Sequence, residues 1–112
     1  MQYMILLFGS EEGWDNASEE KYAEELKKFD TFEAWADEND VKILHAAELA
    51  LSPAAHTVTK DGVETDGPFL EIKEQLGGYY MIETDNPELA KEAARRMPNF
   101  GANELRPRAV RN

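Results

Sequence analysis

The clearest pattern in the chain is a run of apolar residues close to its start. Residues 3–8 are all apolar, and Gly9 ends the run. A strand with one solvated face alternates apolar and polar residues, so a run without alternation is typical of a strand buried on both faces. We therefore expect a strand here. The polar stretch of residues 10–17 follows, with Trp14 isolated in it.

After the polar stretch, apolar residues recur at three- and four-residue spacing, which predicts an amphipathic helix. The stripe consists of Tyr22, Leu26, Phe29, Phe32 and Ala36. Ser18 or Asn16 can cap the start of this helix, and the acidic residues of its first turn suit the positive end of the helix dipole. The helix is expected to end near Asn39.

The middle of the chain predicts short strands. Residues 41–51 form a candidate second strand, and Pro53 interrupts it because proline has no N–H to donate to a ladder. The segments 57–59 and 63–65 flank Lys60-Asp61-Gly62, which predicts a hairpin turn. A loop at residues 66–69 follows.

The last part of the chain predicts strand, helix and strand. Residues 79–83 form the first of these, and Gly77-Gly78 before it indicates a bulge or a close backbone approach. Asp85 or Asn86 can cap the helix, with Pro87 at its first position. Its apolar stripe is Leu89, Ala90, Ala93, Ala94 and Met97, and Pro98 stops it. Residues 104–110 predict a last strand, which Pro107 places at a sheet edge.

This order of elements predicts one domain over residues 1–112, with a ferredoxin-like α+β fold of the βαββαβ type. Its two helices can cover only one face of the antiparallel sheet. Because the first strand is apolar on both faces, the second face also needs cover. A second copy of the chain is the simplest source, so we expect a homodimer that pairs sheet to sheet.

Charge and composition exclude several functional classes. The chain has 23 acidic and 12 basic residues, a net charge of −11, which disfavours nucleic-acid binding because that binding depends on neutralising phosphates. Cysteine is absent, so there is no disulfide or thiolate metal site. The first apolar run is too short for a signal peptide or a membrane span. We expect a cytoplasmic protein with no membrane partner.

Several segments together resemble one known family. The opening residues 3–9, the segment Asp66-Gly67-Pro68-Phe69 and the block that continues to residue 80 are similar to the DGPF, or YCII-related, family. Within that block the matching residues are Thr65, Glu71, Lys73, Glu74, Gln75, Leu76, Gly77, Gly78, Tyr79 and Tyr80. Residues 104–107 look like the family's last strand, so the match runs over nearly the whole chain.

The resemblance implies a ferredoxin-like fold that pairs through its sheets into a dimeric α+β barrel, with a cleft at the pairing surface. Members are mostly of unknown function, and the wider group includes a dehydrochlorinase-like lyase and is suspected to use a His/Asp pair. DGPF proteins are often encoded beside, or fused to, sigma factors of the extracytoplasmic type. This chain departs from the pattern: His45 replaces a small residue, and Thr59 replaces an arginine. If that arginine binds ligand, this chain has either lost or changed its ligand.

Asp66 and His45 are the candidate catalytic residues. Asp66 offers a loop carboxylate as general base or ligand acceptor, although Asp-Gly-Pro is also ordinary turn chemistry. His45 suits proton transfer because imidazole titrates near neutral pH. A histidine among apolar neighbours is more often structural, however. His56 is expected on the hairpin surface.

A further set of residues is predicted to bind ligand: Tyr3, Phe69, Lys73, Glu74, Tyr79 and Tyr80. Lys73 can pair with Asp66, and Phe69 can equally be a hydrophobic anchor. Tyr79 and Tyr80 point to opposite faces of their strand, so one is expected in the core and the other at the cleft. The two histidines lack the spacing of a metal site, and no phosphate loop or dinucleotide fingerprint is present. No metal or cofactor is expected.

Three functional hypotheses follow. The first is a lyase or isomerase that transforms a small organic molecule in the dimer cleft, with Asp66 and His45 in acid–base roles. The second is a non-catalytic ligand-binding or interaction module associated with an extracytoplasmic-type sigma factor. The third is a domain whose motif preserves only fold and dimer. A pocket shared by Asp66 and His45 would favour the first.

Overall fold

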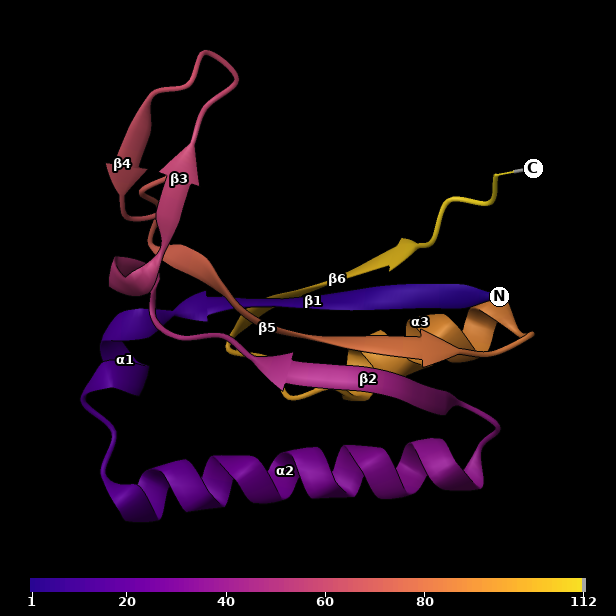
Figure 1. Cartoon of the computed structure of the whole chain (residues 1–112). Helices are drawn as coiled ribbons and strands as arrows, with labels where there is room; N and C mark the ends of the chain where they lie inside the picture. Colours follow the sequence, from indigo (N-terminus) through magenta and orange to yellow (C-terminus); the bar gives the residue numbers. More distant parts are fainter. Residues whose placement is uncertain (112) are drawn as a thin grey trace.

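The computed structural model describes residues 1–111 and consists of a four-stranded antiparallel sheet with helices on one side (Figure 1). In chain order the elements are β1 (Gln2–Ser10), α1 (Glu11–Asp15), α2 (Glu19–Glu38), β2 (Lys42–Glu48), the short 3-10 helix η1 (Ser52–Ala54), β3 (His56–Val58), β4 (Glu64–Asp66), β5 (Glu74–Glu83), α3 (Pro87–Arg96) and β6 (Gly101–Pro107). The strand order is β2-β5-β1-β6, and β3 and β4 pair separately. The expected α+β fold is confirmed and is compatible with a ferredoxin-like arrangement.

The apolar run at the start of the chain forms the centre of β1, one of the two inner strands of the sheet. Tyr3, Ile5 and Leu7 are buried in the core beneath the helices. Met4 and Leu6 alternate with them, point to the opposite side and remain partly exposed. The two faces of β1 therefore differ within one chain: one is core, and the other is an uncovered apolar surface, which we call the open face.

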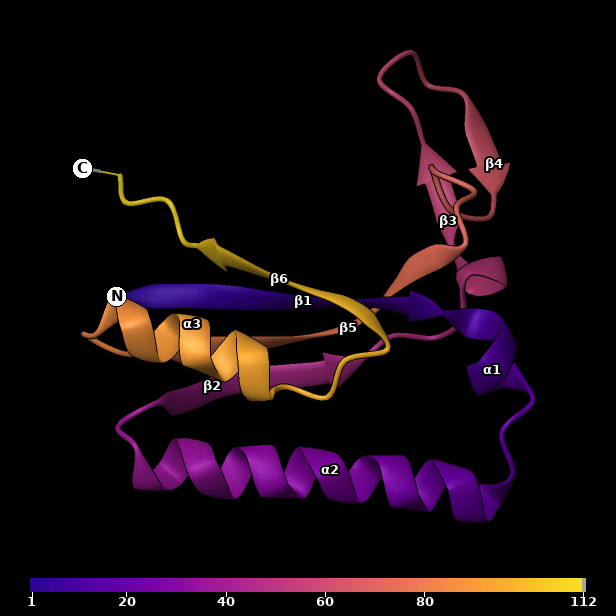
Figure 2. The ribbon, with the colours of Figure 1, turned by 180° about the vertical axis from the view of Figure 1, so that it is seen from behind.

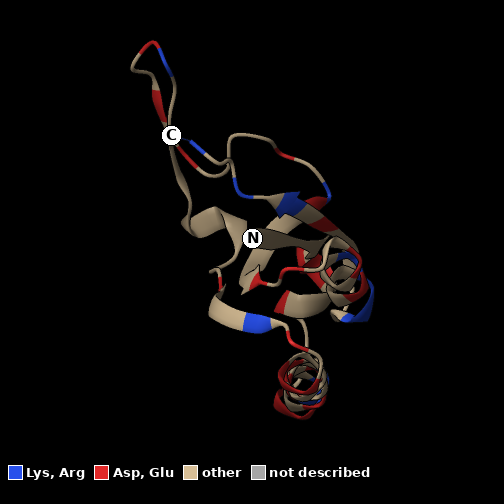
Figure 3. Ribbon diagram, turned by 90° about the vertical axis from the view of Figure 1, so that its right-hand side faces the viewer, with Lys and Arg blue, Asp and Glu red and all other residues tan. Residues whose placement is uncertain are grey.

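The long helix α2 packs the second half of its predicted stripe against the sheet, whereas Leu26 in the first half is 41% exposed. Phe32 and Ala36 are buried, and the ring of Phe32 meets that of Tyr80 edge to face, with 5.4 Å between centroids. Ser18 caps the helix, since its hydroxyl oxygen accepts the backbone N–H of Lys21 at 3.1 Å. Acidic residues are spread along the outside of α2 (Figure 3).

Side chains hold α3 at both of its ends. At the start, the side-chain oxygen of Asn86 accepts the N–H of Glu88 at 2.9 Å, which confirms one of the two predicted caps. At the other end, the side-chain amide of Asn103 donates to the carbonyls of Ala94 and Met97 at 3.2 and 3.0 Å. These contacts satisfy backbone groups that a helix end leaves without partners.

Some predicted bounds were wrong. The second strand ends at residue 48 rather than 51, because its last pair with β5 lies next to the Gly77 bulge and the chain then leaves the sheet. The strand expected from residue 79 begins at residue 74, since it pairs with β1 over its full length. The last strand covers 101–107 instead of 104–110; it lies at the predicted edge.

The polar stretch after β1 also holds more structure than expected. Residues 10–17 were predicted only as a connection, but they contain the short helix α1. Glu11 anchors this helix, because its carboxylate accepts the N–H and the hydroxyl of Ser52 in η1. The contact joins segments 41 positions apart, so the local pattern did not predict it.

The hairpin β3–β4 and the loop after it project from the body of the molecule (Figures 1 and 2). We call residues 55–73 the arm. The predicted turn is confirmed: Gly62 has φ 83°, and its N–H donates to the carbonyl of Thr59 at 2.9 Å. After β4, Gly67 has φ 116°, a conformation that strains other residues, and its N–H donates to Ala55 at 2.7 Å. The Asp66-Gly67-Pro68 segment is therefore a turn.

Within residues 1–111, no helix combines the length and the apolar composition that crossing a membrane requires.

Candidate functional site

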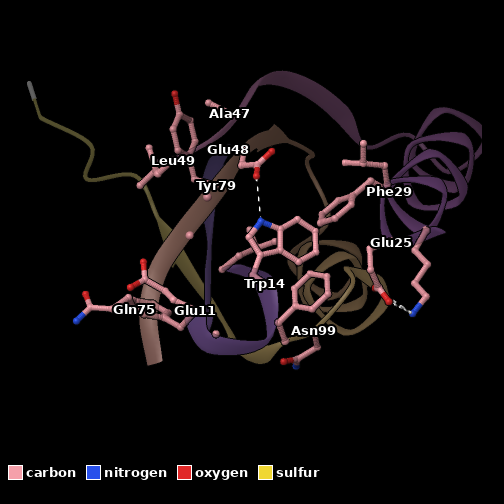
Figure 4. Close-up of a pocket in the computed structure, with 18 of the residues that line it drawn as sticks. Glu11, Trp14, Glu25, Phe29, Ala47, Glu48, Leu49, Gln75, Tyr79 and Asn99 are labelled. Carbon is pink, nitrogen blue, oxygen red and sulfur yellow. Dashed lines mark hydrogen bonds and ion pairs between the residues drawn. The ribbon is translucent and has the colours of Figure 1, made fainter. Parts of the chain in front are cut away.

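A large hollow lies where α2 and the sheet separate, at the end of the sheet next to α1 (Figure 4). We call it the α2 groove; its cavity volume is about 890 Å³. Its walls come from α1, residues 21–33 of α2, the ends of β1, β2 and β5, and the loop before β6. Elements far apart in the sequence therefore form one concave surface.

Glycines lie at the floor of this groove. Along β1, the core side chains of Ile5 and Leu7 are followed by Gly9, and along β5 the buried Tyr80 is followed, one step nearer the groove, by Gly78. Both glycines permit close approach: a Cβ atom on Gly9 would lie 2.7 Å from the Cβ of Phe100, and one on Gly78 2.8 Å from the carbonyl oxygen of Ala47. The row of large core side chains therefore ends at these two positions, where the groove begins.

The Gly77-Gly78 pair produces both of the features predicted for it. The register of β1 and β5 shifts so that Gly77 has no partner, which is a bulge. A Cβ atom on Gly78 would lie 2.8 Å from the carbonyl oxygen of Ala47, closer than real Cβ atoms approach. A glycine at 78 is thus needed for β2 and β5 to pair this closely.

Aromatic rings form a continuous wall along the groove. The Trp14 ring is 5.0 Å from that of Tyr22 and 5.6 Å from that of Phe100, measured between centroids. Phe100 in turn is 6.2 Å from Phe29, which is parallel to Tyr80 at 6.0 Å. Such separations are typical of interacting aromatic pairs. The chain therefore brings four of these rings to the groove, Trp14, Phe29, Tyr80 and Phe100, with Tyr22 packed behind Trp14.

Glu48 connects the aromatic wall to the edge of the sheet. Its two carboxylate oxygens accept the indole N–H of Trp14 at 3.2 Å and the hydroxyl of Tyr22 at 2.7 Å (Figure 4). The hydrogen bond to Glu48, followed by burial, raises the pKa of Tyr22 above its ordinary value, so the phenol remains a donor. The Glu48 carboxylate therefore orients both rings, and the two groups that donate hydrogen bonds to it are uncharged.

Glu25 lies on the α2 wall with a lysine on either side. Lys21 and Lys28 each place their ammonium nitrogen 3.0 Å from a Glu25 oxygen and cover its side chain, which is only 7% exposed. The hydrogen bonds from Lys21 and Lys28 lower the pKa of Glu25 below its ordinary value. The side chains that shield Glu25 from solvent are those of the two lysines, which are flexible and largely solvated themselves. Glu25 is therefore a surface carboxylate in ion pairs and not a group in the packed core.

Tyr80 presents a protonated hydroxyl at the inner end of the groove. It donates to Glu33 at 3.2 Å. Burial, and secondarily the charge of Glu33, raises the pKa of Tyr80 far above its ordinary value. Tyr80 is therefore a hydrogen-bond donor at neutral pH and does not serve as a base there.

The groove can bind a molecule through apolar contact and hydrogen bonds. Ser10 contributes a hydroxyl to the lining, and the carboxylates of Glu11, Glu33 and Glu48 accept hydrogen bonds from neighbouring donors. Within residues 1–111, no group of three histidine, aspartate or glutamate side chains is arranged to hold a metal ion.

The structure places the two predicted catalytic residues in separate regions. Asp66 is on the arm with its side chain 96% exposed, and its carboxylate lies 3.2 Å from Nδ1 of His56. His45 lies on the open face, with Nδ1 2.7 Å from the hydroxyl of Tyr79. Neither residue lines the α2 groove. Each side chain instead contacts a residue on the strand that pairs with its own. Asp66 of β4 contacts His56 of β3, and His45 of β2 contacts Tyr79 of β5.

His56 was predicted on the hairpin surface, and that is where it lies. Its Nε2 is 2.7 Å from Glu64, and Nδ1 faces Asp66. The hydrogen bonds to Glu64 and then Asp66 raise the pKa of His56 above its ordinary value. The two ring nitrogens point to different carboxylates, so this trio stabilises the hairpin rather than converging on one point.

The predicted ligand-binding residues are also dispersed. Tyr3 is buried in the core, and Phe69 is 76% exposed on the arm. Lys73 and Glu74 are exposed where the arm joins β5. Tyr80 is buried towards the helices and Tyr79 is on the other face, which confirms their opposite directions, and these two border the groove.

Apart from Tyr79 and Tyr80, the sequence did not identify the residues that form the groove wall. Trp14, Glu48 and Phe100 come from three separate segments and meet only in the folded chain. One signal was present: Trp14 stands alone in a polar stretch, and a tryptophan is seldom left fully solvated.

Comparison with known proteins gives two matches. The model of the YCII-related domain matches residues 1–112. A curated protein from Rhizobium meliloti (strain 1021), described only as uncharacterised, is 31% identical over 120 residues, covering 98% of this chain and 94% of the relative. The chain is thus similar over its whole length to a protein whose own role is open.

Proposed function

We propose that this chain, which belongs to the YCII-related family, binds a small organic molecule in the α2 groove. The observation that carries the proposal is the hollow itself: about 890 Å³ of space with a wall of aromatic rings and a few placed polar groups. Ligand pockets typically have volumes of about 300–1,000 Å³ and this kind of lining.

Binding without catalysis is the form of the proposal that the geometry supports. An acid–base lyase or isomerase needs a base and an acid within reach of one substrate position. Asp66 and His45 lie in separate regions, and each contacts a local partner. The groove supplies hydrogen-bond donors and acceptors, and its tyrosine hydroxyls remain protonated.

The test is a thermal-shift screen of metabolites on the wild-type chain and on two matched tryptophan variants. Ala46 on β2 lines the groove and is exposed to it, so Ala46→Trp fills the space. Ala34 lies on the outer surface of α2 away from the groove, and Ala34→Trp is the control. A ligand at 100 times its Kd stabilises a folded protein by about 2.7 kcal/mol, which shifts Tm by several degrees.

We expect a ligand that raises the Tm of the wild type and of Ala34→Trp and leaves Ala46→Trp unchanged. Asp66→Ala should respond like the wild type, because Asp66 lies on the arm outside the groove. A ligand whose effect disappears in Asp66→Ala and persists in Ala46→Trp would instead place the site on the arm.

We also propose that two copies pair through the open face. Met4, Leu6 and Phe8 of β1 and Tyr79 and Met81 of β5 are all partly exposed there, and they are apolar or aromatic. A contiguous apolar face of this kind is typical of an interaction surface. Leu6→Glu should convert a dimer into a monomer in light scattering, whereas Ala34→Glu should not. A wild-type monomer at high concentration would contradict the pairing.

An interaction module for an extracytoplasmic-type sigma factor is the second candidate. Its support is the arm, where Phe69, Leu70 and Ile72 are 76%, 58% and 53% exposed. Exposed apolar side chains on a projecting segment suit a protein partner. Such a partner would also place the chain in the cytoplasm. Co-purification should then depend on Phe69, and a complex that Phe69→Ser leaves intact would contradict this use of the arm.

A further inference from the structure

The charge of the α2 groove is strongly negative. Its described lining contains five carboxylates and two ammonium groups, a net charge of −3. The carboxylates are Glu11, Glu25, Asp30, Glu33 and Glu48. Both lysines bind the same carboxylate, Glu25, so they do not neutralise Glu33 or Glu48. An anionic ligand would therefore be repelled from this groove.

The aromatic wall adds an attraction that is specific for cations. The face of an aromatic ring is negative and attracts an ammonium or guanidinium group within about 6 Å of its centroid, with tryptophan the strongest. Trp14 stands in the middle of the groove with Phe29 beside it (Figure 4). Its indole N–H donates to the Glu48 carboxylate, so a negative charge lies at the edge of the ring.

The two tryptophans of the chain differ in what occupies their faces. The guanidinium carbon of Arg96 lies 4.9 Å from the ring centroid of Trp35. Within residues 1–111 this is the one cation placed over an aromatic ring, so no side chain provides the same contact for Trp14. Trp35 has its cation within the fold, and Trp14 faces a cavity.

We propose that the α2 groove selects an organic cation, an amine or quaternary ammonium group carried on an apolar body. This inference rests on the proposed function and adds the chemical class of the ligand. The cationic head lies against Trp14 near Glu48, and the apolar part lies against Phe29 and Phe100. The hydrogen bonds from Trp14 and Tyr22 to Glu48 are retained, because the cation approaches the face of the aromatic ring and does not replace either donor.

The test uses the indole N–H signals of Trp14 and Trp35, the two tryptophans of the chain, in proton–nitrogen NMR spectra. Choline and 3,3-dimethylbutan-1-ol have the same shape and differ in charge. Benzyltrimethylammonium and phenylacetate add an aromatic body with opposite charges. We expect both cations to shift Trp14 and leave Trp35 in place. The alcohol should bind about tenfold more weakly than choline, as the loss of one cation–π contact implies.

A matched pair of variants separates the local carboxylate from overall charge. Glu48→Gln keeps an acceptor for the Trp14 indole and removes the charge, so the Kd for benzyltrimethylammonium should rise about fivefold. Glu38→Gln removes a carboxylate at the far end of α2, outside the groove, and should leave that Kd unchanged. Equal effects of the two variants would overturn a site at Glu48.

The outcomes separate this inference from the function on which it rests. If the alcohol or phenylacetate shifts Trp14 as strongly as the cations, the groove binds ligands and its selectivity for cations is overturned. If neither cation moves Trp14, the inference is overturned as well. The proposed function fails only if the metabolite screen also gives no ligand that Ala46→Trp excludes.

Discussion

The two ends of the helix-covered side of the sheet share the same strands and the same long helix, yet they are built differently. At the end covered by α3 (Figure 2), Ile5, Ile82, Phe32 and Met97 are at most 2% exposed and fill the space between the layers. At the end next to α1, glycines occupy the corresponding strand positions and α2 spans an open groove. The row of large buried side chains therefore ends at the glycines, where Phe100 and β2 approach the strands closely.

This difference separates residues that hold the fold together from residues available for function. Close packing at the α3 end gains dispersion contacts and removes apolar area from water. The aromatic rings at the groove end leave apolar area in contact with solvent, which the fold alone does not require. A ligand in the groove would complete the layer that α3 completes at the other end.

The strongest effect is expected from matched phenylalanine truncations at the two ends. Phe32 is 2% exposed and Phe100 is 39% exposed. Phe32→Ala should lower the free energy of unfolding by about 3–5 kcal/mol, because it leaves a cavity in a packed core. Phe100→Ala should cost about 1–2 kcal/mol, since water already reaches its ring. Urea denaturation measures both, and equal costs would mean that the groove end is packed as tightly as the core.

The next effect concerns the adjacent glycines at the groove floor. Gly78→Ala should destabilise the chain by about 1–3 kcal/mol, because the new methyl group would lie 2.8 Å from the carbonyl oxygen of Ala47. Gly77→Ala is the control: its nearest contact is the Leu7 carbonyl oxygen at 3.8 Å, and its cost should stay below about 0.5 kcal/mol. The same urea titrations compare them, and a reversed order would contradict the close pairing of β2 and β5.

The smallest effect is the pH dependence of the groove wall. Lys21 and Lys28 lower the pKa of Glu25 in the folded state, so their pairing with its carboxylate stabilises the fold only while Glu25 is ionised. This contribution to the free energy of unfolding is fully present above the ordinary glutamate pKa of 4.5 and is lost as the pH falls through the lowered pKa. Glu25→Gln should therefore lower the urea midpoint slightly at pH 7, and the difference from the wild type should shrink as the pH falls below 4.5. Glu38→Gln, away from this cluster, should show no such dependence. The effect is small because both lysines are largely in solvent.

Local patterns along the sequence predicted most of the fold. The unbroken apolar run became β1, the stripe with Phe32 and Ala36 became the buried side of α2, and Gly62 marked the hairpin turn. Each rests on a periodicity or a cap within a few residues. Bounds at the ends of β2, β5 and β6 were less accurate, since pairing partners decide where a strand stops.

The candidate site was much harder to predict than the fold. Asp66 and His45 were chosen for chemistry and family resemblance, but the arm carries Asp66 away from the body and His45 faces the open side. Trp14, Glu48 and Phe100 form a site only because α1, β2 and the loop before β6 converge. Contacts between distant segments leave no local periodicity in a sequence. Of the predicted ligand set, Tyr79 and Tyr80 border the groove.

The most direct test of ligand binding in the α2 groove is the NMR signal of the Trp14 indole N–H, recorded with a ligand from the metabolite screen. We expect the ligand to shift the Trp14 signal, to leave the Trp35 signal in place, and to lose its effect in Ala46→Trp while keeping it in Ala34→Trp. A ligand that stabilises Ala46→Trp as well as the wild type, with the Trp14 signal unmoved, would contradict binding in the α2 groove.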